Sequence, residues 1–151
     1  MSQETPDLAG LHARFNALPP GAQADMRRAE TPEDLRATPA LYRLFPGARP
    51  TPRQIRLAFI LPWCPNERGQ KRLAALLADE ISEQRLIQVV RTPCEHGKDL
   101  IQFRRIIRQL HPRLGWLDIA ETLYFWGVPR KRKLVEDFFM ALHRLDQGAT
   151  S

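Results

Sequence analysis

The side chains that most often carry out catalysis are few in this 151-residue sequence, and they do not form a known catalytic set. Cys94, Glu95 and His96 make a Cys-x-His fragment, which has too few ligands for a zinc site. Cys64 lies between two prolines with no histidine near it in the sequence, which favours a buried thiol over a nucleophile. The chain has no Gly-rich phosphate loop, Gly-x-Ser-x-Gly or His-Glu-x-x-His motif. We therefore predict no enzymatic activity, no cofactor and no bound metal.

Three arginines offer a different chemistry, the binding of phosphate groups. Arg104, Arg105 and Arg108 lie within about one and a half turns of a helix predicted over residues 98–111, beside an apolar stripe. A planar guanidinium can grip a phosphate with two parallel hydrogen bonds, so this spacing suits a row of phosphates. The alternative is a solvated face paired with acids. Because Asp99 is the one acid in that helix, we favour phosphate binding.

A run of cations opens the last predicted helix, which covers residues 129–145. Its members are Arg130, Lys131, Arg132 and Lys133. A helix N-terminus carries partial positive charge, so each exposed cation there costs about 0.3–1 kcal/mol. A placement that breaks this rule indicates an anion-binding site. A solvated corner with screened charges is supported equally well by this segment alone.

Two cations in the first half of the chain are further candidates. Arg27 ends a helix predicted over residues 21–29, where a cation stabilises the helix dipole. Arg53 begins a helix predicted over residues 52–61, against the dipole, and with Arg56 one turn later it could extend a basic strip. Trp116 and Trp126 could stack on bases. Their helical spacing favours core packing instead.

The composition agrees with an anionic partner. Lys and Arg number 23 against 17 Asp and Glu, a formal net charge of +6, so nucleic acid is the first candidate. The longest apolar run, residues 57–65, is far shorter than the roughly 18 residues of a membrane span. The first ten residues lack the pattern of a signal peptide, and two cysteines cannot form a disulfide framework. We expect a cytoplasmic protein that does not contact a membrane.

Helices are predicted from end to end, and they carry all of these arginines. Thr-Pro pairs begin at residues 5, 31, 38, 51 and 92, and Thr-Pro suits an N-cap followed by the first helical position. Asp34, Gln54 and Glu95 follow three of these threonines at the spacing of a capping box. No segment alternates as a strand would. We predict an all-α fold with no sheet, a single module over residues 1–151 with two packed helical bundles at 8–92 and 97–147.

Several segments resemble one family, and their order and spacing are more specific than any one of them. The sequence is similar from about residue 11 to residue 145 to CasB, the small subunit of the type I-E CRISPR surveillance complex, Cascade. It departs from the family in a longer stretch over 91–104 and a short, proline-rich stretch over 62–69. The segments that carry the resemblance are ADMRRA (24–29), TPEDLR (31–36), PALYRL (39–44), QFRRII (102–107), LGW (114–116), LYFWG (123–127) and LVEDF (134–138).

The resemblance implies a non-catalytic, all-α protein that acts in antiviral defence. It implies two copies placed head to tail along the crRNA-bearing backbone subunits of Cascade, with the large subunit as another partner. Contacts to crRNA, target DNA and the displaced single strand would then stabilise the R-loop. By matched position, the basic groups of the family correspond to Arg27, Arg53, Arg104 and Arg105. The charge argument above adds Arg108, Arg130, Lys131 and Arg132.

Two other classes of protein remain open at this point. One is a small helical, sequence-specific DNA-binding regulator, which needs base-reading side chains at the start of a recognition helix. The best candidate helix begins Lys-Asp-Leu-Ile at Lys98, which suits that role poorly. The other is a metal-dependent hydrolase that would use Cys94, His96 and a distant histidine.

Overall fold

The computed structural model describes residues 7–149, with side chains described as far as Arg144. Within that range every regular element is a helix, and the one β-type pairing is an isolated bridge between Asn66 and Gly115. The predicted all-α fold is confirmed. The elements are α1 (Leu8–Asn16), α2 (Pro20–Arg27), the 3₁₀ helix η1 (Pro32–Ala37), α3 (Pro39–Leu44), α4 (Pro52–Ile60), η2 (Leu61–Trp63), α5 (Leu73–Glu80), α6 (Glu83–Arg91), η3 (Glu95–Gly97), α7 (Lys98–Leu110), α8 (Trp116–Tyr124) and α9 (Val128–Ala149).

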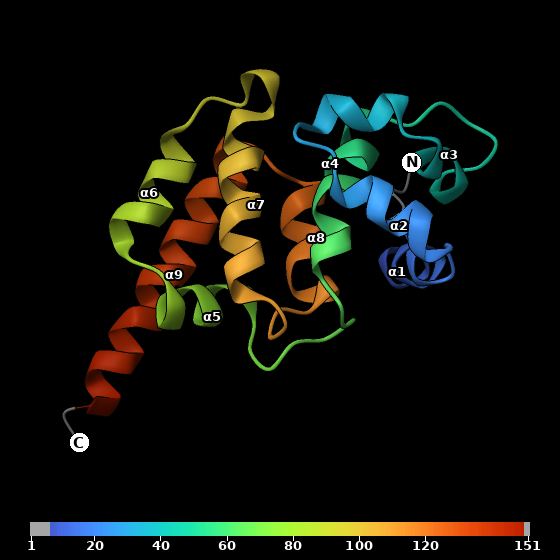
Figure 1. Cartoon of the computed structure of the whole chain (residues 1–151). Coiled ribbons are helices and arrows are strands. Elements are labelled where there is room, and N and C mark those ends of the chain that lie inside the picture. Colours follow the sequence, from blue (N-terminus) through green and yellow to red (C-terminus); the bar gives the residue numbers. More distant parts are fainter. Residues whose placement is uncertain (1–6, 150–151) are drawn as a thin grey trace, which may run out of the picture.

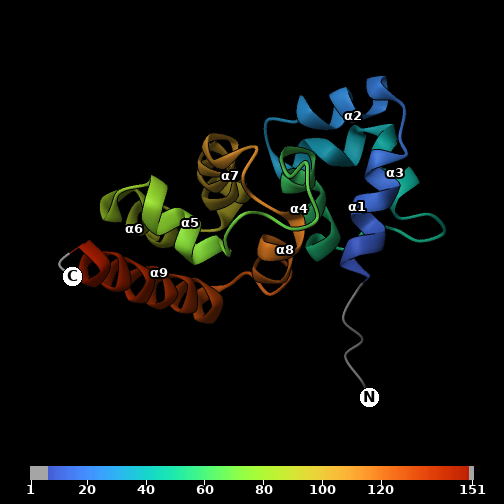
Figure 2. The same cartoon turned by 90° about the horizontal axis from the view of Figure 1, so that it is seen from below.

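The helices form two groups with α8 between them. Helices α1 to α4 lie on one side of the molecule, and α5, α6, α7 and α9 lie on the other (Figures 1 and 2). Helix α5 packs chiefly on α9, and α6 packs on α7 and α9, whereas α8 packs on α4 and α1. Residues 73–91, which the predicted division places with the first bundle, thus pack mainly on α7 and α9. The two lobes stay a prediction.

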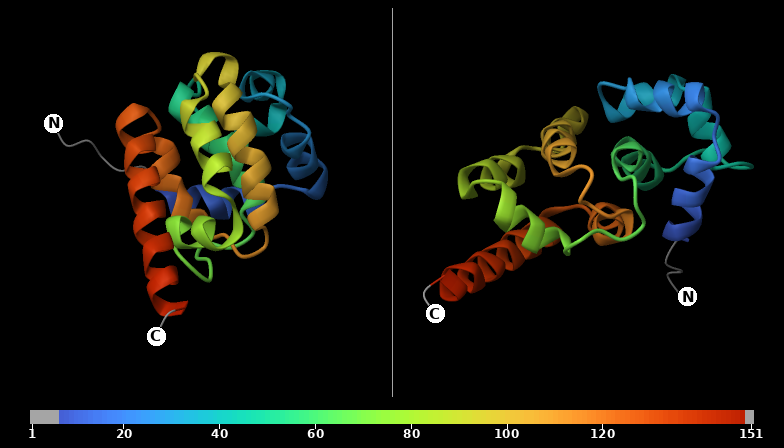
Figure 3. Two further views of the ribbon diagram at one scale, coloured as in Figure 1. Left: turned by 90° about the vertical axis from the view of Figure 1, so that its left-hand side faces the viewer. Right: turned by 60° about the horizontal axis from the view of Figure 1, so that its bottom comes forward.

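Helix α9 is the longest element and lies along the edge of the second group. In Figure 3 it runs past the ends of its neighbours, and its C-terminal turns extend beyond α5. Phe138 is buried on its inner face, while Phe139 and Met140 are exposed. No helix within residues 7–149 has the length and apolarity needed to cross a bilayer.

The Thr-Pro pairs begin helices at three of the four described positions. Thr31 and Thr51 form complete capping boxes with Asp34 and Gln54, as predicted. Thr38 precedes α3 without a side-chain hydrogen bond. Thr92 instead ends α6, where its hydroxyl donates to the carbonyl oxygen of Gln88 at 2.6 Å, so the box with Glu95 does not form. The pair at residues 5 and 6 lies outside the described residues.

The core is continuous across both groups and fixes two of the three tryptophans. Trp116 is fully buried, and its indole N–H donates to the carbonyl oxygen of Leu8 at 2.7 Å, which ties α8 to α1. Trp126 is stacked on Phe103 with ring centroids 5.1 Å apart. Both rings therefore belong to the core, as their spacing predicted.

Candidate nucleic-acid interface

The arginines of α7 do not all face solvent, contrary to the simple ridge expected from their spacing. Arg104 is half-buried, with its guanidinium 4.2 Å from the centroid of the Phe59 ring and a hydrogen bond to the carbonyl oxygen of Ala29. Burial lowers the pKa of Arg104, and the neighbouring charges of Arg108 and Arg105 lower that pKa further. Arg104 therefore joins α7 to the first group of helices. Arg105 and Arg108 remain exposed.

Arg108 and Arg27 line one cleft although they are far apart in the sequence. The Arg108 guanidinium lies over the ring of Trp63, 4.4 Å from its centroid. Arg27 lies 5.8 Å from the centroid of Phe15, and its Nε donates to the carbonyl oxygen of Pro62 at 3.3 Å. We call this hollow, about 540 Å³ in volume, the Trp63 cleft. Its lining is Phe15, Asn16, Arg27, Pro62, Trp63, Cys64, Pro65, Arg108 and His111.

Arg53 and Arg130 meet on a second surface, at the junction of α4, α8 and α9. Arg53 lies 5.0 Å from the ring centroid of Tyr124 and 5.9 Å from that of Phe125. Arg130 approaches the same Phe125 ring at 5.3 Å. Its ion pair with Glu121 is long, at 3.8 Å, and Phe125 is exposed. We call Arg53, Tyr124, Phe125 and Arg130 the Phe125 patch.

Arg56 does not extend a basic strip, because its guanidinium points inward. It donates to the carbonyl oxygen of Leu123 at 2.9 Å and is within 3.5 Å of the carbonyl oxygens of Tyr124 and Trp126. Such carbonyls at a helix end have no partner within the helix. Arg56 therefore satisfies the C-terminal end of α8 and holds the Phe125 patch in place. Burial lowers the pKa of this guanidinium, while Asp99 acts in the opposite direction.

Lys131 lies in the core, which corrects its predicted place on the basic surface. Its ammonium is 2.7 Å from Asp99 Oδ2, the side chain of Asp99 is fully buried, and Lys131 is 7% exposed. The ammonium also donates to the carbonyl oxygen of Thr92 at 3.3 Å, and the indole N–H of Trp126 donates to Asp99 at 2.8 Å. Asp99 thus neutralises Lys131 and leaves the α7 arginines without an acid from their own helix.

The remaining cations of the α9 start are partly compensated. Lys133 pairs with Asp137 one turn later at 3.0 Å, and both side chains are exposed. Arg132 is exposed, and none of the ion pairs in the described part of the chain includes it. Of the four cations, Lys131 is therefore in a buried ion pair, and Arg130 and Lys133 are in pairs nearer the surface. Arg132 is exposed to solvent.

The residues considered for catalysis are not brought together. Cys64 is buried, and burial raises the pKa of its thiol. Cys94, directly before η3, and His96, within η3, are both exposed. Across residues 7–149 no group of three or more His, Cys, Asp or Glu side chains is arranged to hold a metal ion.

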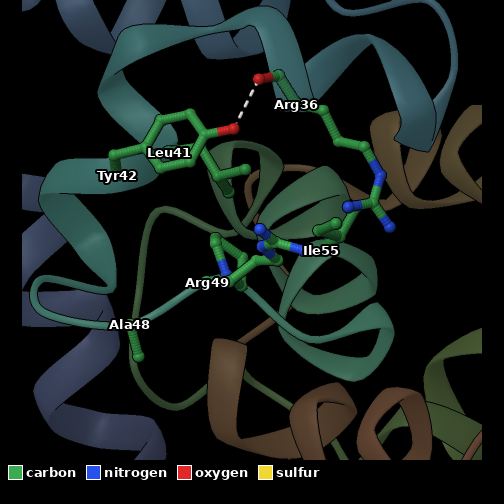
Figure 4. A pocket seen from close by; sticks show the side chains of 7 residues that line it. Arg36, Leu41, Tyr42, Ala48, Arg49 and Ile55 are labelled. Atoms are coloured by element: carbon green, nitrogen blue, oxygen red, sulfur yellow. Dashed lines mark hydrogen bonds between the residues drawn. The ribbon is translucent and has the colours of Figure 1, made fainter.

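A separate hollow of about 370 Å³ lies among the first helices, and none of the predicted site residues lines it. Figure 4 shows Arg49 lying beside Ile55, and the Tyr42 hydroxyl donates to the carbonyl oxygen of Arg36 at 2.6 Å. The Arg36 guanidinium already pairs with Glu33 at 2.9 Å. Arg49 is exposed and joins neither basic surface.

Sequence reasoning missed Trp63 and Phe125 as parts of these surfaces. Both are reached only through tertiary contacts with arginines from other elements. The burial of Asp99 did have a signal, because it stands four residues before Phe103 and so continues the apolar stripe of α7.

Comparison with known proteins points to the same family as the sequence segments. No family model matches the chain. The CRISPR system Cascade subunit CasB of Escherichia coli (strain K12) is 30% identical over an alignment 155 residues long, which includes 91% of this chain and 96% of that protein. A chain in the crystal structure of E. coli Cascade bound to a PAM-containing dsDNA target is also 30% identical. It superimposes with a TM-score of 0.78 over 93% of this chain and 99% of the other.

Proposed function

The chain belongs to the CasB family of Cascade subunits, and from this membership we propose that it stabilises the R-loop of a crRNA-guided complex without catalysing a reaction. The observation that carries the proposal is the match over nearly the full length of both chains, in sequence and in fold. The structural relative belongs to a complex bound to a dsDNA target. The partners proposed for this chain are the large subunit, the crRNA-bearing backbone subunits, a second copy of itself, crRNA and target DNA.

The proposed contacts to nucleic acid come from cations that the fold leaves available. Lys131, Arg104 and Arg56 are held by groups of the protein itself. The cations that remain at least partly exposed on the two surfaces or beside them are Arg27, Arg53, Arg105, Arg108, Arg130 and Arg132. Contacts of this kind to phosphates position a strand and add affinity without reading its sequence.

Such contacts suit the energetics of R-loop formation. The guide–target heteroduplex is about as stable as the DNA duplex that it replaces, so contacts from protein to backbone can decide the balance. Sequence is read by base pairing with the guide, and this subunit then needs no base-specific side chains. The similarity to a Cascade subunit supports the non-catalytic part of the proposal.

The structure does not favour a sequence-specific regulator. A recognition helix must present its first turn to base edges. The first turn of α7 instead contains Asp99 and Leu100, both buried, with Asp99 paired to Lys131 of α9. The side chains of Asp99 and Leu100 therefore lie in the core and do not face a ligand.

The test uses Cascade reconstituted with this subunit and a double variant of the Phe125 patch, Arg53→Gln with Arg130→Gln. We expect the variant to join the complex and to bind target DNA more weakly. The salt slope of binding should fall by about 1 for each phosphate that the substituted arginines no longer neutralise. The reduction should be the same for targets of different sequence, each with its matching guide.

Arg49→Gln is the matched control, since it removes an exposed arginine that lies outside both surfaces. R-loop affinity and salt slope that stay at wild-type values in the Phe125 patch variant would contradict the proposed contacts. Cleavage of labelled DNA by the purified chain with Mg²⁺ or Mn²⁺, abolished in a Cys94 or His96 variant, would contradict the non-catalytic role.

A further inference from the structure

The three tryptophans differ in how their indole N–H groups are satisfied. Those of Trp116 and Trp126 donate to Leu8 and Asp99, which fixes both rings in the core. The Trp63 Nε1 is buried and has no hydrogen-bond partner in the described structure. A buried N–H without an acceptor is unfavourable and is uncommon in folded proteins. Trp63 is therefore the one tryptophan of the three that internal hydrogen bonding does not hold in place.

The lining of the Trp63 cleft contains two arginines, Arg27 and Arg108, together with His111, and no acidic side chain. Arg108 is exposed and covers the Trp63 ring through a cation–π contact at 4.4 Å, an interaction worth little at an exposed site. A phosphate within reach offers Arg108 a charge-assisted hydrogen bond, which is stronger than its contact with the ring.

The walls of the cleft suit a flat ring. Phe15, Pro62 and Pro65 add apolar surface beside the indole. The volume of about 540 Å³ falls within the range of pockets that hold small ligands. Bases of single-stranded nucleic acid stack on aromatic side chains while basic groups hold the adjoining phosphates.

We propose that the Trp63 cleft receives one nucleotide of a single strand, whose base stacks on Trp63 while its phosphate draws Arg108 off the ring and contacts Arg27. The proposal rests on the proposed function and adds a base-stacking site to the phosphate contacts described above. It predicts binding that depends on the presence of a base but not on its identity, because every base has a stacking face.

The experiment measures binding of the full-length chain to two single-stranded probes of equal length and charge. One is an oligothymidylate and the other is the same backbone without bases. Wild-type protein is expected to prefer the base-containing probe by about fivefold or more, the range that stacking on one aromatic side chain gives. Trp63→Leu should abolish this preference and leave the affinity and salt slope for the abasic probe unchanged. Trp63→Phe should retain most of it, because a ring remains.

If thermal melting shows that Trp63→Leu is unfolded, two further measurements still test the proposal. Tryptophan emission should change when wild-type protein binds oligothymidylate and should not change in Trp63→Phe, because Trp116 and Trp126 are buried. Arg108→Gln should weaken binding of both probes, whereas Arg49→Gln should have a smaller effect. Equal affinity of the wild-type protein for the two probes would overturn the proposal.

An acidic peptide is the other occupant that this chemistry could select. If polyglutamate binds the wild-type chain and changes Trp63 emission while oligothymidylate does neither, the cleft takes a protein ligand and the proposal is wrong. Any of these failures would leave the R-loop measurements on the Phe125 patch unaffected. The two proposals can therefore fail separately.

Discussion

At the scale of single residues, burial decides which charges are available to a ligand. Lys131 and Arg132 are neighbours in the same cationic run, yet one is 7% exposed and paired with Asp99 while the other faces solvent. The sequence predicts the cations and their helix, because the run precedes a clear apolar face. It could not predict which of them turns inward, since that depends on where α7 presents Asp99.

The buried pair gives a prediction for stability. Lys131→Met leaves the Asp99 carboxylate without its cation in the core, and breaking a buried pair in this way costs about 3–5 kcal/mol. The exposed pair of Lys133 and Asp137 provides the control, because Lys133→Met should cost about 0.5 kcal/mol or less. Urea unfolding of the two variants checks both values. If they are equally stable, the pair does not hold α9 on α7.

At the scale of elements, local signals predicted where helices begin better than how helices pair. The capping boxes at Thr31 and Thr51 depend on neighbours three residues away, so the sequence contains all that they need. The segment over residues 92–97 contains the same Thr-Pro signal but ends one helix instead. Its geometry depends on a contact with η1 from the first group of helices, which no local pattern reports.

That contact passes through Gly97, which has a left-handed conformation with φ of 68°. A Cβ built on this residue would lie 2.6 Å from Cδ of Pro32. We expect Gly97→Ala to destabilise the protein by about 1–2 kcal/mol from backbone conformation alone, and by more if Pro32 cannot move. Thermal melting of Gly97→Ala, with Gly21→Ala as the control, measures the effect.

Gly21 is a suitable control because it lies in α2 and a Cβ there meets nothing within 4 Å. Gly21→Ala should leave stability unchanged or raise it by up to about 1 kcal/mol. A Gly97→Ala variant as stable as the wild type would mean that η3 and η1 can move apart at little cost in stability.

At the scale of the whole molecule, folding brings four of the predicted arginines together on two surfaces. Arg27 and Arg108 come together at the Trp63 cleft, and Arg53 and Arg130 come together at the Phe125 patch. The helices that carry these residues were predicted from periodicity and capping. Their assembly was not, because each pair joins segments more than 70 residues apart whose packing is set by the shared core.

Because the two surfaces have no residue in common, their contributions to binding should be additive. We expect a variant with glutamine at Arg27, Arg53, Arg108 and Arg130 to lose as much binding free energy for the R-loop as the two double variants together, within about 0.5 kcal/mol. Reconstituted Cascade measured across a salt series gives all three values. A smaller combined loss would mean that one strand contacts only one surface at a time.

The aromatic rings beneath the arginines have a consequence for how tightly this protein can hold a strand. Arg27, Arg53 and Arg130 each lie over a ring before any ligand arrives. Long side chains normally lose rotamer freedom when they bind, and a ring that already restricts the guanidinium shifts part of that entropic cost to folding. A lysine at the same position would keep the charge but not the flat stacking surface. The protein therefore meets nucleic acid with cations that are pre-organised.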